Sequence, residues 1–357
     1  MYIWFLDLVC AMSKIKYLHV GSAAVFIGPL LKVIDAEFDR DEHLFILYDS
    51  LAGQSLREER NVIVYNGRSF KGICCYVLIF WYLFAARKVF LHGLFDVKML
   101  LLLFLTPFWG GKVYWIAWGG DLYDRFYESG GVRGRLTKYL RARVIKRVKH
   151  IVTYMEGDYR RAVEWFGMNA QYHECLMYPS NTYKELDARK EINASLNILL
   201  GNSADPLNRH FEIFDLIAGR LPSEYTIYAP LSYGEDKYKE LVAEEGKKRF
   251  GDRFKVLDQF MGYQEYTNFL GSMDVIIFNH PIQQAMGNTI TALGLGKTVY
   301  LRKDVSQWEL FQGLGIDILP VDDVDDLVVL ECSLNKQKVK EYFSIENLIN
   351  QLRLIYC

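Results

Sequence analysis

The sequence has few cysteines, and they are not spaced as a structural metal site or a disulfide framework would need. Six occur among 357 residues, and no C-x-x-C pair is present. This usage excludes a zinc framework and a disulfide scaffold, and it favours a reducing cytoplasm.

An excess of charge of one sign is also absent. The chain carries 42 basic and 43 acidic residues, for a formal net charge of −1. Such a balance argues against a generic nucleic-acid binder, so no nucleic-acid partner is expected. The chain is 51% hydrophobic and 24% charged, which is typical of folded globular proteins, and its length suits two domains.

Apolar runs long enough to span a bilayer, which takes about 20 residues, are missing as well. The runs at 73–86 and 99–105 are shorter, and we expect them to form buried helices. Residues 1–10 are apolar, but they lack the basic segment and the small-residue cleavage site of a signal peptide. We expect residues 1–13 to be an extension ahead of the first strand, with Met12 as a second candidate start.

What the sequence does contain is a regular alternation of short apolar segments with amphipathic ones. In the second half this pattern predicts strands at 196–200, 225–229, 255–257, 275–278 and 298–301. It predicts helices there at 210–220, 236–250, 264–272, 284–294 and from 306 onward. In the first half it predicts strands at 16–19, 43–48, 62–65, 89–91, 112–117 and 151–154, and helices at 26–38 and 71–86.

This alternation predicts an α/β protein with two Rossmann-like domains, each built on a parallel sheet covered on both faces. A polar break with a proline near 178–195 divides the pattern, so we assign residues 1–180 to one domain and 181–357 to the other. The last helix is a candidate to return to the first domain. In such folds the ligand is expected in the crevice between the domains, at the carboxyl ends of the strands.

Two polar segments of the second half occupy this position. Gly201, Asn202 and Ser203 lie between a predicted strand and a predicted helix, where backbone N–H groups can bind a phosphate. The segment QQAMGNT at 283–289 opens the helix after strand 275–278, where free amides and Gly287 would suit a diphosphate. A tight turn and a plain polar helix start are the alternatives.

Two segments of the first half also follow predicted strands. His92 follows strand 89–91, and Asp121 closes the segment that begins at Trp118, so both lie at one sheet edge. Either could act as a general base on an acceptor hydroxyl. Gly119 and Gly120 would let the backbone approach a ligand, and Trp118 could stack on a sugar. A histidine bonded to backbone and an aspartate capping a helix are the alternatives.

Residues 133–150 form a basic amphipathic pattern that contains no acid. Such a helix could lie on an anionic membrane leaflet, where each cation near the surface contributes about 1 kcal/mol. It could equally be a solvated helix with its apolar stripe in the core, and both can hold together. The candidate membrane-surface cations are Arg133, Arg135, Lys138, Arg141, Arg143, Lys146 and Arg147.

Two D-x-D pairs occur, at Asp39/Asp41 and Asp323/Asp325. Some glycosyltransferases use such a pair to hold a metal ion that bridges a nucleotide diphosphate. Here one pair precedes a strand and the other lies in a late acidic loop, so we expect surface charge and no metal site.

Together these motifs resemble glycosyltransferase family 56, the bacterial 4-acetamido-4,6-dideoxygalactose transferases of enterobacterial common antigen synthesis. The resemblance runs from about residue 15 onward. Its matching segments, in order, are His92-Gly93, WGGDLY at 118–123, the break at 178–180, GNSADPLNRH at 201–210 and QQAMGN at 283–288.

The resemblance implies a GT-B fold and an inverting glycosyltransferase that needs no metal and no cofactor. It implies transfer of a deoxyamino sugar from a dTDP- or UDP-sugar to an undecaprenyl-diphosphate-linked saccharide, in common antigen or O-antigen synthesis. The protein would lie peripherally at the cytoplasmic face of the bacterial inner membrane, in contact with anionic lipid.

The candidate residues fall into three roles, and the resemblance, carried over by position, supplies the donor-binding set. The base would be Asp121 or His92. Acceptor-binding residues would be Trp118, Gly119, Gly120 and Tyr123. Donor-binding residues would be Gly201, Asn202, Ser203, Asn208, His210, Tyr263, Gln283, Gln284, Gly287, Asn288 and Thr289.

Two other functions fit the same two-domain pattern. A non-catalytic sugar-nucleotide binding protein would lack a base at the strand ends of the first domain. A sugar-nucleotide epimerase of related fold would need neither a lipid acceptor nor a basic membrane helix.

Overall fold

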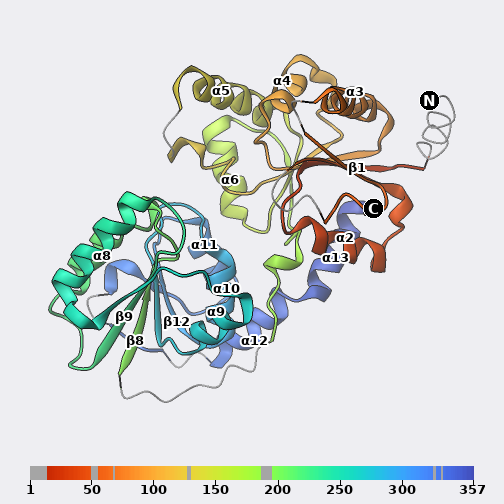
Figure 1. The fold of residues 1–357 in the computed structure, drawn as a ribbon. Coiled ribbons are helices and arrows are strands. Elements are labelled where there is room, and N and C mark those ends of the chain that lie inside the picture. The colour runs from red at the N-terminus through yellow and green to blue at the C-terminus, as the bar shows by residue number, and fades with distance from the viewer. Residues whose placement is uncertain are drawn as a thin grey trace. The chain divides into compact units, whose positions relative to one another are not determined.

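A computed structural model describes residues 14–49, 55–66, 69–126, 130–185, 195–324, 327–330 and 333–357. The chain divides into two compact units, of which the first comprises Met1–Ser180 and Leu348–Cys357 and the second Asn181–Asn347. Each unit is built on one parallel sheet (Figure 1). The extension predicted at 1–13 lies outside the described residues.

The first sheet has seven parallel strands in the order β3-β2-β1-β4-β5-β6-β7. The strand order changes direction between β1 and β4, which makes their carboxyl ends the topological switch point of this sheet. Its strands are β1 (Tyr17–Ser22), β2 (His43–Tyr48), β3 (Val62–Tyr65), β4 (Lys88–His92), β5 (Val113–Ile116), β6 (His150–Val152) and β7 (Gln171–His173).

Helices cover both faces of this sheet. Helices α3, α4 and α5 lie on one side, and α2 and α13 lie on the other (Figure 1). The last turns of α13 belong to the first unit because Tyr356 packs its ring against Tyr17 and Phe90. The helices are α2 (Ile27–Glu37), α3 (Phe70–Ala85), α4 (Val97–Leu105), α5 (Gly131–Arg147), α6 (Glu156–Phe166) and α13 (Ile345–Tyr356).

The second sheet has six parallel strands in the order β10-β9-β8-β11-β12-β13, and its core is built on Phe214, Ile227 and Ile277. Its strands are β8 (Leu196–Leu200), β9 (Tyr225–Pro230), β10 (Phe254–Leu257), β11 (Val275–Phe278), β12 (Thr298–Leu301) and β13 (Leu319–Pro320). Its helices are α7 (His210–Ile217), α8 (Asp236–Phe250), α9 (Tyr263–Gly271), α10 (Met286–Gly294), α11 (Ser306–Gly313) and α12 (Ser333–Tyr342).

The predicted α/β class with two parallel sheets is therefore confirmed. One boundary differs where function was expected, because α10 begins at Met286, two residues later than predicted. The residue before it, Ala285, has φ of 56° and lies in the left-handed region. That conformation cannot continue a right-handed helix, so the preceding glutamines belong to a turn.

The prediction that residues 73–86 and 99–105 form buried helices is only half right. They fold as α3 and α4, but the outer stripe of each helix is exposed, with Val77 at 64% and Leu105 at 66%. A helix packed on one sheet face buries only one of its own faces, whatever the other carries. None of the helices in the described part of the chain is both long and apolar enough to cross a membrane.

The expected core stripe of α5 is also only partly buried. Leu140 and Val144 face the core, whereas Val132, Leu136 and Tyr139, in the first half of the helix, are at least half exposed. The first turns of α5 therefore present apolar and basic side chains to solvent together.

Candidate functional site

The turn after β8 is built around Gly201, whose backbone conformation and close neighbours favour glycine. Its φ is +67°, and its N–H donates to the carbonyl oxygen of Ile277 at 3.0 Å. A Cβ at this position would lie 2.6 Å from Oδ1 of Asn208 and 2.7 Å from Nε2 of His210. The glycine therefore lets two polar side chains pack against the end of the strand.

Asn208 is buried, and its side-chain amide stabilises this turn through hydrogen bonds. Its Oδ1 accepts the backbone N–H of Asn202 at 2.8 Å, and its Nδ2 donates to Oγ of Ser203 at 3.2 Å and to the carbonyl of Asp205 at 3.0 Å. Ser203 is 1% exposed. The structure thus places the side chains of Ser203 and Asn208 inside the turn, which corrects the expectation that they contact a donor directly.

His280 is a residue that the sequence motifs missed. Its Nε2 lies 3.0 Å from Oδ1 of Asn202 and 2.9 Å from Oδ1 of Asn208. Since both partners are acceptors, Nε2 carries the proton and Nδ1 is left as a buried acceptor without a hydrogen-bond partner among the described residues. Burial lowers the pKa of His280 to about 3, so the ring is neutral. Its position two residues after β11, at the carboxyl end of a strand, is the sequence feature from which it could have been predicted.

His210 is the second buried histidine of this turn. Its Nδ1 lies 3.3 Å from the hydroxyl oxygen of Tyr238, and the residue is 1% exposed. Burial lowers the pKa of His210 to about 4, with the Leu200 carbonyl acting in the opposite direction. This ring supports Gly201 from within the unit instead of reaching a ligand at its surface.

A pocket of about 290 Å³ opens beside the turn, at the carboxyl edge of the second sheet. Two asparagine–tyrosine pairs form part of its wall: Nδ2 of Asn202 donates to the hydroxyl of Tyr233 at 3.0 Å, and Nδ2 of Asn288 to that of Tyr266 at 3.1 Å. Burial raises the pKa of both tyrosines, so their hydroxyls stay protonated. The pocket is lined by Asn202, Pro230, Ser232, Tyr233, Leu257, Gln259, Phe260, Met261, Tyr266 and Asn288.

The start of α10 forms another side of this region. No side chain caps the helix, which leaves the N–H groups of its first turn without a capping acceptor from a side chain. Space is open above the Cα of Gly287, so a ligand could approach the backbone there. Thr289, in contrast, is fully buried and donates its hydroxyl to the carbonyl of Ala285, which corrects its assignment as a donor ligand.

Three further residues predicted to bind the donor lie in the turn before α10 and at the start of α9. Gln283 and Gln284 are half-buried in the turn before α10, and the carbonyl of Gln284 accepts from Nε2 of Gln307 at 2.7 Å. Tyr263 is the first residue of α9, and its side chain lies outside the described part. Among the described side chains of α9, Tyr266, one turn later, lines the pocket.

In the first unit, Asp121 is a fully buried carboxylate. It accepts from the backbone N–H of Leu94 at 2.9 Å and that of Trp118 at 3.0 Å, and from the indole N–H of Trp115 at 2.7 Å. Burial raises the pKa of Asp121, and these hydrogen bonds oppose the rise. The residue ties the loop after β4 to the loop after β5. This geometry favours a structural role, and the role of Asp121 as the base stays a prediction.

His92 belongs to a buried chain of aromatic polar groups. Its Nδ1 lies 2.5 Å from the hydroxyl of Tyr178, and its Nε2 lies 3.0 Å from Nδ1 of His19. Nε2 of His19 lies in turn 3.1 Å from Nδ1 of His43. Burial lowers the pKa of His92 to about 3. Because both ring nitrogens are engaged inside the unit, the geometry favours a structural histidine, and the role of His92 as a base stays a prediction.

The residues expected to bind the acceptor separate into two groups. Tyr123 is 1% exposed and donates its hydroxyl to Asp158 at 2.7 Å, so it supports the core and does not face an acceptor. Trp118 is half-buried, and its indole N–H donates to Tyr178 at 2.9 Å. Gly119 has φ of +80° and is buried, whereas Gly120 is exposed, so of these two glycines only Gly120 is accessible at the surface of the unit.

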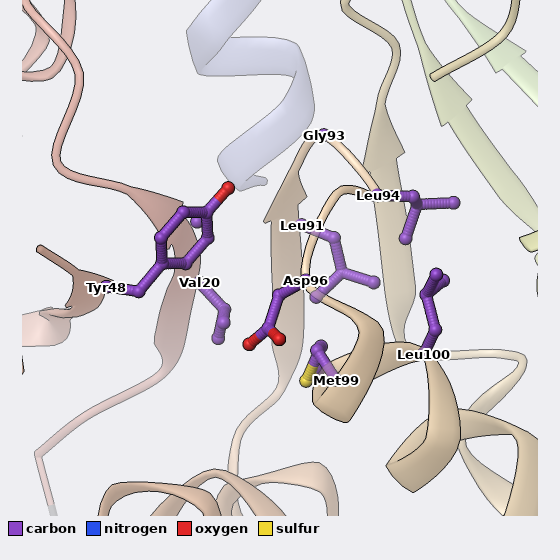
Figure 2. Close-up of a pocket in the computed structure, with 9 residues that line it drawn as sticks. Val20, Tyr48, Leu91, Gly93, Leu94, Asp96, Met99 and Leu100 are labelled. Atoms are coloured by element: carbon purple, nitrogen blue, oxygen red, sulfur yellow. The ribbon is translucent and has the colours of Figure 1, made fainter. Parts of the chain in front are cut away.

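A small pocket lies at the switch point of the first sheet (Figure 2). Its volume of about 10 Å³ suits one water molecule and not a sugar ring. The carboxylate of Asp96 points into it, near Val20 and Met99 (Figure 2). Asp96 caps α4 by accepting the N–H of Lys98 at 3.0 Å, and it accepts the hydroxyl of Tyr76. No sequence motif singled this residue out.

The basic helix α5 keeps most of its predicted cations at the surface. Arg133, Arg135, Arg143, Lys146 and Arg147 are exposed and Lys138 is half-buried. Arg141 is 7% exposed instead, because its Nε donates to the carbonyl of Leu94 at 2.7 Å and its guanidinium pairs with Asp124 at 2.6 Å. Its assignment to the membrane surface is therefore wrong.

Comparisons with known protein families and solved structures agree with the two-sheet fold described above. A family model described as 4-alpha-L-fucosyltransferase, glycosyl transferase group 56, matches residues 80–342, more than half of the chain. The crystal structure of Anabaena HepE in complex with UDP is 12% identical, with a TM-score of 0.69 and coverage of 96% of this chain and 99% of that chain.

Two further solved structures belong to lipopolysaccharide synthesis. The outer core galactosyltransferase WaaB is 12% identical, with a TM-score of 0.64 and coverage of 95% of this chain and 98% of that one. The glycosyltransferase WaaG is 10% identical, with a TM-score of 0.59 and the same two coverages. At these identities the likeness establishes the fold, which is of the GT-B type. With the family match, it follows that the chain belongs to glycosyltransferase family 56 and is a glycosyltransferase.

Proposed function

We propose that this enzyme moves a deoxyamino sugar from a nucleoside-diphosphate donor, dTDP- or UDP-linked, to a saccharide carried on undecaprenyl diphosphate. The main support for a nucleotide-sugar donor is the pocket of about 290 Å³ beside the Gly201 turn. It lies where nucleotides bind in Rossmann-like units, at the carboxyl edge of the sheet.

The walls of this pocket suit a nucleoside. Tyr233 and Tyr266 offer aromatic surface together with protonated hydroxyls, and Phe260 is 84% exposed beside them. Asn202 and Asn288 supply amide groups that can bond a base or a ribose. HepE, which shares the fold, was crystallised with UDP, and this supports a nucleotide donor here.

The diphosphate would lie against the start of α10. A helix N-terminus carries a partial positive charge, and the uncapped amides near Gly287 can donate to phosphate oxygens. These groups would stabilise the charge that develops on the leaving diphosphate, so the proposal requires no metal. Of the D-x-D residues, Asp39 accepts the N–H of Asp41, which pairs with Arg60 at 3.1 Å, and Asp325 lies outside the described residues.

The base belongs to the first unit in this proposal. We assign the proton transfer to Asp96, because its carboxylate, which accepts from the Lys98 N–H and the Tyr76 hydroxyl, is only half-buried, whereas Asp121 and His92 are fully buried. The acceptor hydroxyl would lose its proton to this carboxylate as it attacks the anomeric carbon, with inversion in a single displacement. Trp118, beside the exposed Gly120, would stack on the acceptor saccharide.

A lipid-linked acceptor requires the enzyme to work at a membrane. The exposed cations of α5, among them Arg133 and Arg143, would attract an anionic leaflet. We therefore propose peripheral binding at the cytoplasmic face of a bacterial inner membrane, in synthesis of a surface polysaccharide such as common antigen or O-antigen.

A transfer assay tests the proposal. The purified chain is incubated with an undecaprenyl-diphosphate disaccharide and with one dTDP- or UDP-sugar at a time. The mass of the lipid-linked product is then measured by mass spectrometry. We expect a mass increase of one sugar and release of the nucleoside diphosphate. Donor binding without transfer to any acceptor would favour a binding protein, and conversion of the donor without acceptor would favour an epimerase. Either result would overturn the proposal.

A further inference from the structure

The outer stripe of α3 is apolar and faces solvent. Ile73, Val77, Trp81 and Phe84 recur about every four residues, which is one helical face, and each is at least half exposed. The opposite face, with Ile79 and Leu83, is buried, so the helix is apolar all round. A helix of that kind is normally covered on all sides, because exposed apolar surface of this extent is costly in water.

This stripe continues onto the neighbouring helices. The ring of Phe108 stacks on Phe84 with centroids 4.4 Å apart, and Leu105 on the same segment is 66% exposed. The ring of Phe104 then meets Tyr139 of α5 at 6.3 Å. We call the exposed apolar side chains of α3, of residues 101–108 and of the first half of α5 the apolar face. Helices α3, α4 and α5 lie along one side of the first unit (Figure 1).

The charge on the segments that carry the apolar face is mainly positive, with Asp121, Asp124 and Glu128 confined to the stretch that precedes α5. Asp96 is the only acidic residue between 61 and 120, and residues 130–155 contain none. The guanidinium of Arg143 lies 5.2 Å from the ring centroid of Tyr139, and that of Arg147 lies 5.3 Å from that of Phe104. The face is thus bordered by cations that stay in solvent.

This combination selects among the surfaces that could cover the face. A second copy packed through the same face would bring two cationic rims together, which is unfavourable. An anionic bilayer offers acyl chains to the apolar centre and negative headgroups to the rim. Trp81 and Tyr139 are of the types that concentrate at the boundary between headgroups and acyl chains.

We infer that the apolar face inserts into the headgroup–acyl boundary of an anionic membrane, with the outer stripe of α3 as the principal inserted element. This goes beyond the electrostatic contact that the proposed function gives to α5, because it makes docking hydrophobic and therefore resistant to salt. It does not depend on which sugar the enzyme transfers.

Vesicle flotation tests the inference with the full chain. Vesicles of phosphatidylethanolamine and phosphatidylglycerol are compared with phosphatidylcholine vesicles, each at low salt and at about 1 M salt, where the Debye length is about 3 Å. We expect binding to the anionic vesicles that largely survives high salt. Val77→Glu and Leu105→Glu should each weaken it about tenfold or more, since each replaces an inserted apolar side chain with a charge.

Leu354→Glu is the matched control. Leu354 is 80% exposed on α13, on the other side of the sheet, so the same change there should leave vesicle binding at the wild-type level. Thermal melts of all three variants should match the wild type because the three side chains are exposed. Quenching of Trp81 fluorescence by lipids brominated on the acyl chain, lost in Trp81→Phe, would place the ring below the headgroups.

Three results would overturn the inference. The first is complete release of the protein from anionic vesicles at high salt, together with binding of Val77→Glu and Leu105→Glu at low salt that equals the binding of Leu354→Glu. This result would leave the cations of α5 as the membrane contact. A dimer in light scattering that Val77→Glu dissociates would assign the face to a second copy. Absence of vesicle binding with an intact fold would assign it to a protein. A transfer assay with a short-chain, detergent-soluble acceptor separates membrane docking from catalysis. Val77→Glu should transfer sugar to this acceptor as the wild type does, because the reaction needs no membrane. Absence of transfer by the wild type itself would count against the proposed function and not against the membrane contact.

Discussion

Replacing Gly201 with alanine would test whether the turn after β8 positions the donor. The new Cβ would lie 2.6 Å from Oδ1 of Asn208 and 2.7 Å from Nε2 of His210, closer than real Cβ atoms approach other atoms. The amide of Asn208 would have to move, and with it the hydrogen bonds to the Asn202 N–H and to His280. The turn that borders the pocket would then lose its support.

The magnitude has two parts. Alanine at a φ of +67° costs about 1–2 kcal/mol in backbone energy. Loss of two buried hydrogen bonds adds about 1 kcal/mol each, or more if a group is left unsatisfied. If the displaced turn forfeits even one hydrogen bond to the nucleotide, such as that from Asn202, nucleotide affinity should fall about tenfold, since 1.4 kcal/mol corresponds to a factor of ten.

Gly219→Ala is the matched control for the backbone term. Gly219 also has a positive φ, of +74°, but nothing lies within 4 Å of the position that its Cβ would take. Isothermal titration with dTDP and UDP should therefore show wild-type affinity for Gly219→Ala and a loss of about tenfold for Gly201→Ala. Equal nucleotide affinity in the two variants, both folded, would refute the reasoning.

Three further predictions concern the first unit. Asp96→Asn should keep the cap of α4, because asparagine caps as well as aspartate, yet lower kcat about a hundredfold or more with little change in donor KM; an unchanged kcat would exclude Asp96 as the base. Arg141→Met should lower stability to urea by about 3 kcal/mol, because it leaves Asp124 partly buried without its ion pair, whereas Arg143→Met on the exposed face should not; equal midpoints would contradict this. Burial holds the pKa of His92 at about 3 in the folded state, below about 6.5 when unfolded, so the unfolded chain binds more protons. Stability should thus fall as the pH drops from about 6.5 toward 3, by about 1.4 kcal/mol per pH unit for this group, and a flat urea midpoint between pH 7 and 5 would contradict it.

The fold was predictable because its signals are local. The strands at 196–200, 275–278 and 298–301 are short apolar runs between helical patterns, and they fold as β8, β11 and β12 with the predicted bounds. Strand β7 was not predicted, since its residues Gln171–His173 are polar or amphipathic and none is fully buried. A strand at the sheet edge needs no apolar run to form, so its sequence carries no such signal.

The roles of single side chains were harder to predict because they depend on distant partners. The order of the strands places Gly201 at the carboxyl edge, but only the packed structure shows that Asn208 turns inward and that His280 joins it. The motif around Asp121 predicts a base, whereas the packed structure shows its Oδ1 accepting from Trp118 and its Oδ2 accepting from Trp115 and Leu94. The composition of α3 likewise could not distinguish a buried helix from one with an exposed apolar stripe.

Hydrogen–deuterium exchange with and without a dTDP-sugar tests the donor site most directly. If the donor binds at the carboxyl edge of the second sheet, amide exchange should slow in the Gly201 turn, around Tyr233 and over the first turn of α10. Exchange at Asp121 and His92 should not change at saturating donor alone. Protection confined to the first unit, or no protection of these three segments by a donor that is turned over, would contradict the assignment.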